Sequence, residues 1–308
     1  MKFLKGISLS PLTTLRVGGV ARHFCKPADK EELRQALFFA MERGLEIFPL
    51  GRGANTIFGD FDGLVLSTRR LRGMKVRRVG RALLVEARAG EKLSEIVKLS
   101  LEAGLEGFYR LAGFPATVGG AVAMNAGAFG YEVSRHLVEV EFMDWEGRLH
   151  RVKASEIEFS YRSSPFPELG IIVSAVFEIP FCQGSVREEY QAVVSKRKKT
   201  QPINMPTSGS TFKNPPEDYA GRLLEKVGMK NYRVGDITFS DLHANFLVNL
   251  GGGTYRQVVK IIEEAKRRVY EEFGISLEEE VRLVESGGAY GWKIRGEGDL
   301  SQERRGSS

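Results

Sequence analysis

Apolar and polar residues alternate along the chain with two periods, which predict a protein that mixes helices and strands. Helical spacing between capping residues predicts helices over 29–43, 91–103, 186–199, 218–227 and 254–273. Shorter apolar runs predict strands over 45–50, 64–66, 82–87, 138–143, 148–152, 171–179, 246–250 and 276–284. Asp29 with Glu32, and Thr254 with Gln257, are predicted capping boxes. These elements together predict the α+β class.

Changes in the pattern divide the chain into four parts. Residues 1–70 carry a helix, a strand and a glycine turn, and residues 71–183 are rich in strands. Residues 184–284 form an α/β lobe large enough for its own small core. Residues 285–308 are polar and charged, so we predict that 285–300 return to the first part and that the tail is loosely ordered.

One segment, Leu111–Tyr131, has no charged side chain, and eleven of its nineteen central residues, 112–130, are Gly or Ala. It is long enough for a membrane span, which needs about 20 apolar residues. Pro115, Thr117, Asn125 and five glycines argue against a span and against a buried core helix. A segment with so little side-chain bulk allows its backbone to approach a large flat ligand and to bind phosphate through its N–H groups. We therefore predict that this segment forms a cofactor-binding site together with the turn Gly51–Asn55.

Composition narrows the class of protein. The 308 residues are 42% hydrophobic and 27% charged, which is typical of a globular protein. The two cysteines, Cys25 and Cys182, are too few for a disulfide framework and suit a reducing cytosol, and we expect no signal peptide. The net charge of +6 suits an anionic ligand, although a solvated surface explains it equally. We expect neither nucleic-acid nor membrane binding, because the basic clusters lack interleaved aromatic residues.

Three polar islands carry side chains that could do chemistry: Ser160–Ser164, Ser208–Pro215 and Glu278–Arg282. Each also has an ordinary explanation, as a surface ion pair, a proline-bounded turn and a solvated strand edge. The four histidines are scattered and neither cysteine has a partner at ligand spacing, so we expect no metal site. No Ser/His/Asp arrangement can be argued either.

The islands and the glycine-rich stretches together resemble the UDP-N-acetylenolpyruvoylglucosamine reductase (UDP-N-acetylmuramate dehydrogenase, MurB) family. The resemblance runs from Thr14–Gly19 to Arg282. It depends on the order and spacing of five motifs: GRGAN at 51–55, AGFPATVGGAVAMNAGAFG at 112–130, SYRSSPF at 160–166, SGSTFKNP at 208–215 and EEVR at 279–282. The segment between Arg162 and Ser210 is too short for the tyrosine-bearing loop of one subgroup, so the chain resembles the subgroup without it.

The resemblance implies a two-part FAD-binding fold of the vanillyl-alcohol-oxidase/PCMH type, formed by 1–70 and 71–183, with 184–284 as a substrate-binding lobe. It implies FAD as cofactor, NADPH as co-substrate and a UDP-sugar enolpyruvyl ether as substrate, in peptidoglycan precursor synthesis. The cofactor-binding residues that it implies are Gly51, Arg52, Gly53, Ala54, Asn55, Thr56, Gly113, Pro115, Ala116, Thr117, Gly119, Gly120, Ala121, Ala123, Asn125, Ala126 and Gly127.

By the same resemblance, Arg162, Ser210 and Glu280 are catalytic, and Lys198 and Asn214 bind the UDP diphosphate. Hydride addition leaves enolate-like charge on the substrate, which an arginine can stabilise. A serine held within hydrogen-bonding range can protonate the resulting carbanion. Glu280 helps only if it is protonated or orients a neighbouring donor.

Two other functions stay open from the sequence. One is a different FAD-linked oxidoreductase of the same superfamily, and the other is a basic binding module without catalysis. Composition alone does not distinguish FAD from FMN or NAD, because all three use similar backbone contacts. We expect a cytoplasmic monomer.

Overall fold

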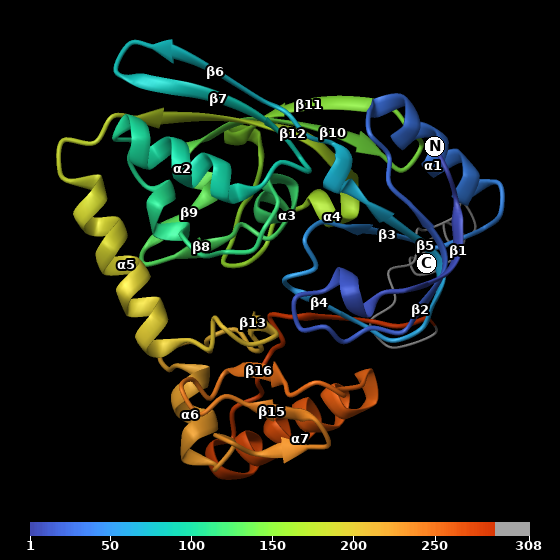
Figure 1. Cartoon of the computed structure of the whole chain (residues 1–308), viewed down its shortest axis with the longest axis vertical. Helices are drawn as coiled ribbons and strands as arrows, with labels where there is room; N and C mark the ends of the chain where they lie inside the picture. Colours follow the sequence, from blue (N-terminus) through green and yellow to red (C-terminus); the bar gives the residue numbers. More distant parts are fainter. Residues whose placement is uncertain (287–308) are drawn as a thin grey trace, which may run out of the picture.

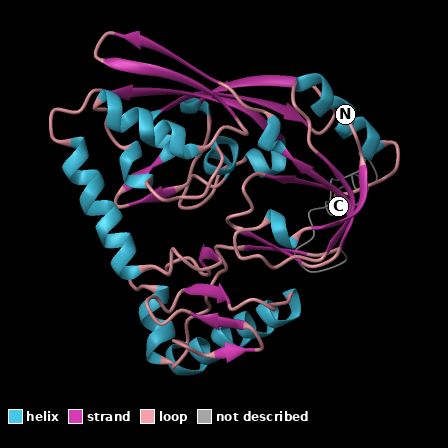
Figure 2. Cartoon of the chain, in the orientation of Figure 1, coloured by secondary structure: helices cyan, strands magenta, loops and turns pink. Residues whose placement is uncertain are grey.

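The computed structural model describes residues 1–286 as two sheet-based parts above a smaller third lobe (Figures 1 and 2). Residues 287–308, which include most of the predicted loose tail, lie outside the described residues. The helix α5 (Val186–Thr200) leads from the second part down to the third lobe along one side of the molecule.

The first part is a four-stranded sheet in the order β1-β2-β5-β3. The strands β2, β5 and β3 are parallel to one another and β1 is antiparallel to β2. The helix α1 buries Leu33 and Leu37 against this sheet. The elements are β1 (Leu4–Ser8), β2 (Val20–Cys25), α1 (Lys30–Met41), β3 (Ile47–Leu50) and β5 (Phe61–Ser67).

The second part is a five-stranded antiparallel sheet in the order β11-β10-β12-β7-β6. The helices α2 and α3 bury Ile96 and Val122 in one core with Val85 and Ala175 of the sheet. The glycine-rich segment thus lies on one face of a rigid sheet. The elements are β6 (Met74–Val79), β7 (Ala82–Arg88), α2 (Leu93–Ala103), α3 (Val118–Ala123), β8 (Gly127–Ala128), β9 (Tyr131–Glu132), β10 (Leu137–Asp144), β11 (Leu149–Lys153), α4 (Phe166–Leu169) and β12 (Gly170–Pro180).

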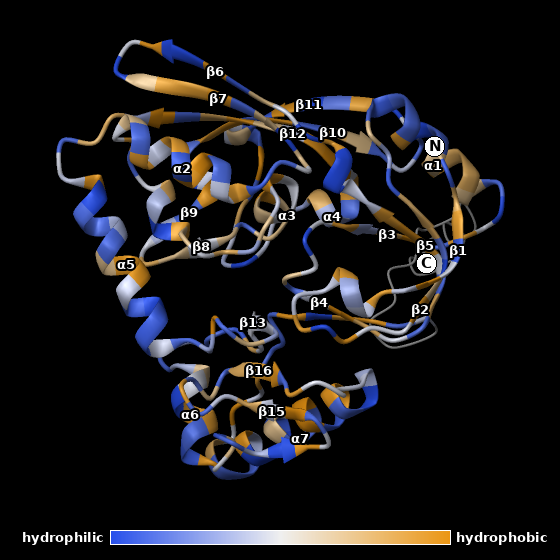
Figure 3. Cartoon of the chain, viewed as in Figure 1, coloured by the Kyte–Doolittle hydropathy of each residue, from blue (hydrophilic) through white to orange (hydrophobic). Residues whose placement is uncertain are grey.

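The third lobe packs two helices on a four-stranded sheet in the order β13-β16-β15-β14. The helix α7 is strongly amphipathic, with an orange stripe along it in Figure 3, and it buries Val258, Ile261 and Val269. Leu15 and Val17 from the start of the chain complete this core. The elements are β13 (Thr207–Ser210), α6 (Ala220–Lys226), β14 (Arg233–Val234), β15 (Ile237–Phe239), β16 (Phe246–Asn249) and α7 (Tyr255–Phe273).

The chain then returns to the first part. The strand β17 (Arg282–Val284) pairs in parallel with β4 (Thr56–Phe58), directly after the glycine turn. The hydroxyl of Ser286 accepts a hydrogen bond from Asp62 N–H at 2.6 Å. This crossing puts Glu280 and Arg282 next to residues that precede them by more than 220 positions in the sequence.

Most predicted elements are confirmed, and the errors are local. The predicted strand 276–284 is wrong over its first half, because Glu280 N–H donates to Thr211 O in the third lobe at 2.8 Å and only 282–284 pair with β4. The capping box at α1 is half correct: Asp29 caps the helix, but Glu32 accepts from Ala28 N–H instead. The helix predicted from 91 begins at Leu93.

Candidate active site

The turn Gly51–Asn55 follows the buried strand β3, and one arginine holds it in place. Arg69 donates Nε to Gly51 O at 2.8 Å and Nη2 to Arg52 O at 3.0 Å. Gly53 has φ +69, and a Cβ there would lie 2.4 Å from Leu12 O, so only glycine fits. The turn is therefore a fixed backbone surface.

The glycine-rich segment supplies the opposite surface. Thr117 caps α3, since its hydroxyl accepts from Gly120 N–H at 3.3 Å. A Cβ on Gly119 would lie 2.8 Å from Ala89 Cβ, and a Cβ on Gly51 would lie 2.6 Å from Thr117 Oγ1. The two glycine stretches thus come close to each other because side chains are absent from both.

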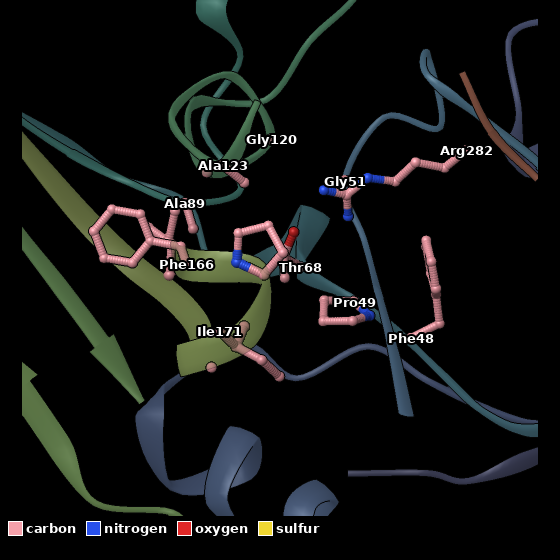
Figure 4. Close-up of a pocket in the computed structure, with 14 residues that line it drawn as sticks. Phe48, Pro49, Gly51, Thr68, Ala89, Gly120, Ala123, Phe166, Ile171 and Arg282 are labelled. Carbon is pink, nitrogen blue, oxygen red and sulfur yellow. The ribbon is translucent and has the colours of Figure 1, made fainter. Parts of the chain in front are cut away.

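A cleft of about 80 Å³ lies between these surfaces (Figure 4). Four of the predicted cofactor-binding residues line it, namely Gly51, Gly119, Gly120 and Ala123. The other lining residues are Phe48, Pro49, Thr68, Ala89, Phe166, Pro167, Gly170, Ile171, Ile172 and Arg282. Backbone that is free of side-chain bulk beside an apolar wall and a cation fits a flat dinucleotide that carries phosphates.

Arg282 is the charged residue among the lining residues that the sequence did not predict, because the EEVR motif implied a role only for its glutamate. Its side chain extends toward Gly51 in Figure 4. Burial lowers the pKa of this guanidinium, as expected for a cation held away from water. The interpretation of 278–282 as a solvated strand edge is therefore wrong for Arg282 and, as shown below, for Glu280.

The remaining predicted cofactor-binding residues lie outside the lining of this cleft. Asn55 donates its side-chain amide to Glu280 O at 2.8 Å, which ties the turn to the strand carrying the glutamate. Gly127 lines a second pocket, described below. The others outside the lining are Arg52, Gly53, Ala54, Thr56, Gly113, Pro115, Ala116, Thr117, Ala121, Asn125 and Ala126.

Two of the three predicted catalytic residues are in contact. Arg162 donates Nε to Glu280 Oε1 at 2.9 Å, and both side chains are largely buried, at 17% and 16% exposure. Burial raises the pKa of Glu280, while Arg162 and Lys213 counteract that rise. A carboxylate in this position orients the guanidinium, which leaves Arg162 able to bind a further anion.

Ser210, the third predicted catalytic residue, lies at the end of β13, one residue before Thr211. The carbonyl of Thr211 accepts the backbone N–H of Glu280 at 2.8 Å. The backbone segments that carry Ser210 and Glu280 are therefore neighbours, although they are 70 positions apart in the sequence. The structure brings the three polar islands together at one junction of the lobes.

A second pocket of about 530 Å³ adjoins this junction. It is more open and more polar than the cleft and is lined by Arg162, Tyr161 and the β8–β9 hairpin. Arg162 also stacks over the Tyr161 ring, 4.7 Å from the ring centroid. Arg162 thus belongs to the wall of a space large enough for a small ligand.

The two predicted phosphate-binding residues have different surroundings. Lys198 is exposed on α5. Asn214 accepts Ala220 N–H at 3.1 Å through Oδ1, so only its NH₂ group is left for a ligand. The neighbouring Arg197 is 6% exposed, lies between the rings of Phe114 and Phe129, and has no hydrogen bond from Nε or Nη2 within 1–286. Burial lowers its pKa to about 10.

Other kinds of site find no support in the described residues. Over residues 1–286, no group of His, Cys, Asp and Glu is arranged to hold a metal ion. Within the same range, no helix has the length and apolar character needed to cross a bilayer.

Comparison with known proteins defines the class first. Residues 21–153 match the FAD binding domain family, and residues 201–284 match the C-terminal domain of UDP-N-acetylenolpyruvoylglucosamine reductases. With the glycine-lined cleft, these matches identify an FAD-dependent oxidoreductase, as predicted.

Relatives then give the family. The reductase of Aquifex aeolicus is 50% identical over 296 residues, which cover 96% of this chain and all of the relative. That of Moorella thermoacetica is 39% identical over 92% of the chain and 93% of the relative. The crystal structure of the Thermus caldophilus enzyme superposes with a TM-score of 0.73 at 32% identity, covering 92% of this chain and 98% of that one. The chain belongs to the UDP-N-acetylenolpyruvoylglucosamine reductase family, which confirms the predicted resemblance.

Proposed function

We propose that the protein uses NADPH, through FAD, to reduce UDP-N-acetylglucosamine enolpyruvate to UDP-N-acetylmuramate in peptidoglycan precursor synthesis. The observation that carries this is the largely buried Arg162–Glu280 pair, whose glutamate is hydrogen-bonded both to Asn55 of the glycine turn and to Thr211 of the third lobe. A pair of this kind suits a substrate that carries a carboxylate and gains negative charge during reaction.

The chain's own groups fit the flavin. Gly51, Gly119 and Gly120 offer backbone at close range, and Arg282 supplies positive charge at the cleft. When bound, FAD supplies hydride transfer between NADPH and the enolpyruvyl carbon. Phe166 and Ile171 exclude water from the other wall of the cleft.

Arg162 has the central role in this proposal. Its guanidinium binds the substrate carboxylate and stabilises the enolate-like charge that develops next to it. Glu280 in its ionised form accepts from Nε and fixes the plane of the guanidinium. The 2.9 Å contact favours this orienting role over proton donation by Glu280.

Ser210 is the proposed proton donor to the substrate carbon. It lies at the end of β13, on the third lobe, whereas the cleft belongs to the first two parts. Lys198 and Asn214 are proposed to bind the diphosphate; Arg197, next to Lys198 in the sequence, is a buried cation that has unused donors. The cytoplasmic location, the monomeric state and the absence of nucleic-acid or membrane binding stay predictions.

The test is Ser210→Ala in purified, flavin-replete protein. We expect flavin absorbance to bleach normally with NADPH, and re-oxidation by the enolpyruvyl sugar nucleotide to slow by about 10²–10⁴-fold, the usual value of a positioned proton donor. Ser195→Ala, on the exposed surface of α5, is the matched control. Full-rate re-oxidation in Ser210→Ala, or no turnover of this substrate by the unaltered protein, would indicate a different FAD-linked oxidoreductase.

A further inference from the structure

The neighbourhood of Arg162 contains an unusual concentration of strained backbone. Arg162 has φ +58, Asn125 has φ +42 and Phe129 has φ +51. Each such conformation costs about 1–3 kcal/mol and persists only where the surrounding structure enforces it. Something near Arg162 must therefore hold its turn, and the β8–β9 hairpin, which includes Phe129, is the adjacent element.

One hydrogen-bonded chain joins the hairpin to that turn. Asn125 donates Nδ2 to Glu132 Oε2 at 3.0 Å and to Ser160 O at 3.0 Å. Ser160 and Ser163 then exchange two backbone hydrogen bonds around Arg162, at 3.2 and 3.1 Å. The carboxylate of Glu132 is thus connected through one amide to the turn that imposes the strained conformation of Arg162.

Glu132 also acts on Arg162 directly. Its Oε1 lies 3.9 Å from Arg162 Nη1, which is an ion-pair distance but too long for a hydrogen bond. Arg162 uses its other nitrogens elsewhere, with Nε on Glu280 and Nη2 on Gly127 O at 2.8 Å. Within residues 1–286, Nη1 alone makes no hydrogen bond, and both Arg162 and Glu132 line the 530 Å³ pocket.

The backbone of the β8–β9 hairpin packs tightly against Glu132 and Arg162. Gly127 pairs with Glu132 across β8 and β9. A Cβ on Gly127 would lie 2.7 Å from Glu132 Cγ and 3.2 Å from Arg162 Nη1. The hairpin, Glu132 and the guanidinium are therefore packed against one another, so a change in one is felt by the others.

We propose that Glu132 is a positioning residue for Arg162. Through Asn125 it stabilises the strained turn 160–163, and through its second oxygen it holds Nη1 turned to the pocket until a ligand carboxylate takes that nitrogen. The identity of the ligand as the enolpyruvyl substrate rests on the proposed function, whereas the support of the turn does not. Glu132 itself touches no reacting atom.

Two variants separate its hydrogen bonding from its charge. Glu132→Gln keeps an oxygen that can accept from Asn125, whereas Glu132→Ala removes both oxygens. The first readout is hydrogen–deuterium exchange of the Ser160 and Ser163 amides in the protein without substrate. The second is the split between kcat and KM for the enolpyruvyl substrate. Glu178→Ala removes an exposed glutamate from β12 and serves as control.

We expect Glu132→Ala to speed exchange of both amides and to lower kcat, each by about tenfold to a hundredfold, the range for loss of a charge-assisted hydrogen bond. Glu132→Gln should restore exchange to within about threefold, since the accepted hydrogen bond survives, whereas kcat should stay lowered, since the ion pair with Nη1 is lost. Unchanged exchange in Glu132→Ala overturns the proposal, and so does a Gln variant whose Ser160 and Ser163 amides exchange as fast as those of the Ala variant. Because exchange is measured without substrate, a wrong substrate assignment would leave that result intact.

Discussion

The cleft and the Arg162–Glu280 junction are built on opposite principles. One side of the cleft is made of backbone, with Gly51, Gly119 and Gly120 at its surface and few atoms beyond Cα, and it faces an apolar wall. The junction is made of long side chains that reach across from separate lobes and meet at 2.9 Å. The cleft exists because side chains are missing from its glycines, whereas the junction exists because two side chains are held in fixed positions.

The difference teaches where each region is vulnerable. A cradle made of backbone fails when atoms are added, because a methyl group fills space that a ligand needs. A pair of side chains fails when atoms or charges are removed, because the partner is then left buried and uncompensated. Substitutions that add or remove a few atoms therefore test the two regions in opposite directions.

The largest effect is expected for Arg162→Lys. Lysine keeps the charge but cannot donate to both Glu280 and Gly127 O in the geometry of a planar fork. Substrate reduction should slow by about 10²–10³-fold, while the visible flavin spectrum stays unchanged. Stopped-flow kinetics of flavin re-oxidation measures this. Arg187→Lys, exposed on α5, is the control. Equal rates of flavin re-oxidation in the two variants would show that the junction does not depend on the geometry of the Arg162 side chain.

Gly120→Ala should change protein stability and FAD affinity in opposite directions. The new Cβ would meet only Thr117 Oγ1, at a tight 3.3 Å, so this capping side chain must shift by a few tenths of an ångström. Replacing glycine inside α3 should therefore raise the unfolding free energy of the apoprotein by at most about 0.5–1 kcal/mol. The same methyl group points into the cofactor's space, so FAD affinity should fall at least tenfold by titration.

Gly184→Ala is the matched control, because a Cβ there has no neighbour within 4 Å. If Gly120→Ala bound FAD as tightly as Gly184→Ala, the cleft would not be the cofactor site.

Glu280→Gln tests, through the pH dependence of the rate, whether ionised Glu280 orients Arg162 at the junction. Burial raises the pKa of Glu280, so its ionised form is lost as pH falls through that raised value. The rate of substrate reduction should fall along the same acidic limb if the ionised form orients Arg162. Glu280→Gln should be slower by about tenfold above the limb and should lack the limb itself. An unchanged limb in the variant would assign it to another group.

The smallest effect is expected at Asp144, which pairs with Gly170 of the cleft lining across β10 and β12 but lines neither pocket itself. Burial opposes ionisation of this carboxyl, but hydrogen bonds from His150 and Arg148 outweigh it and lower its pKa to about 2. Because the pKa of Asp144 is lower in the folded than in the unfolded protein, the ionised group stabilises the fold at pH values above about 4, the pKa in the unfolded protein. This stabilisation is lost as the pH falls toward 2. Asp144→Asn should cost about 1–2 kcal/mol at pH 7, since Arg148 is largely exposed and solvent screens the pair.

Urea unfolding at two pH values measures this cost. The difference between Asp144→Asn and the unaltered protein should be smaller at pH 3 than at pH 7, whereas exposed Glu146→Gln should differ little at either. Flavin binding and turnover should be unaffected in both variants.

The sequence predicted the elements whose signals are local. The helix α7 begins and ends as its caps Thr254 and Gly274 indicate, because each cap satisfies backbone groups within one turn. The strands β1 and β2 were missed although they have five and six residues, and the shorter β4 and β13 were missed because three or four residues carry no usable period. The strand 276–284 was overestimated because its first half binds a loop of the third lobe, which is a long-range contact.

The site was predictable as a set of motifs but not as a geometry. The resemblance named Arg162 and Glu280, yet no local sequence pattern indicates that these two residues, 118 positions apart, are in contact at 2.9 Å. Arg282 was missed because its position beside Gly51 follows from the parallel pairing of β17 with β4. Glu132 was missed because a lone glutamate after a tyrosine has no sequence signature.

The start of the chain has a consequence for how the protein is made. Leu15 and Val17 complete the core of the third lobe, and Asn249 donates Nδ2 to Leu15 O across 234 positions. The third lobe is synthesised last but needs residues that were synthesised first, so its folding closes a loop of about three-quarters of the polypeptide. A gene fragment encoding residues 184–286 alone should yield insoluble product, and co-expression of a peptide covering 1–20 should improve its solubility.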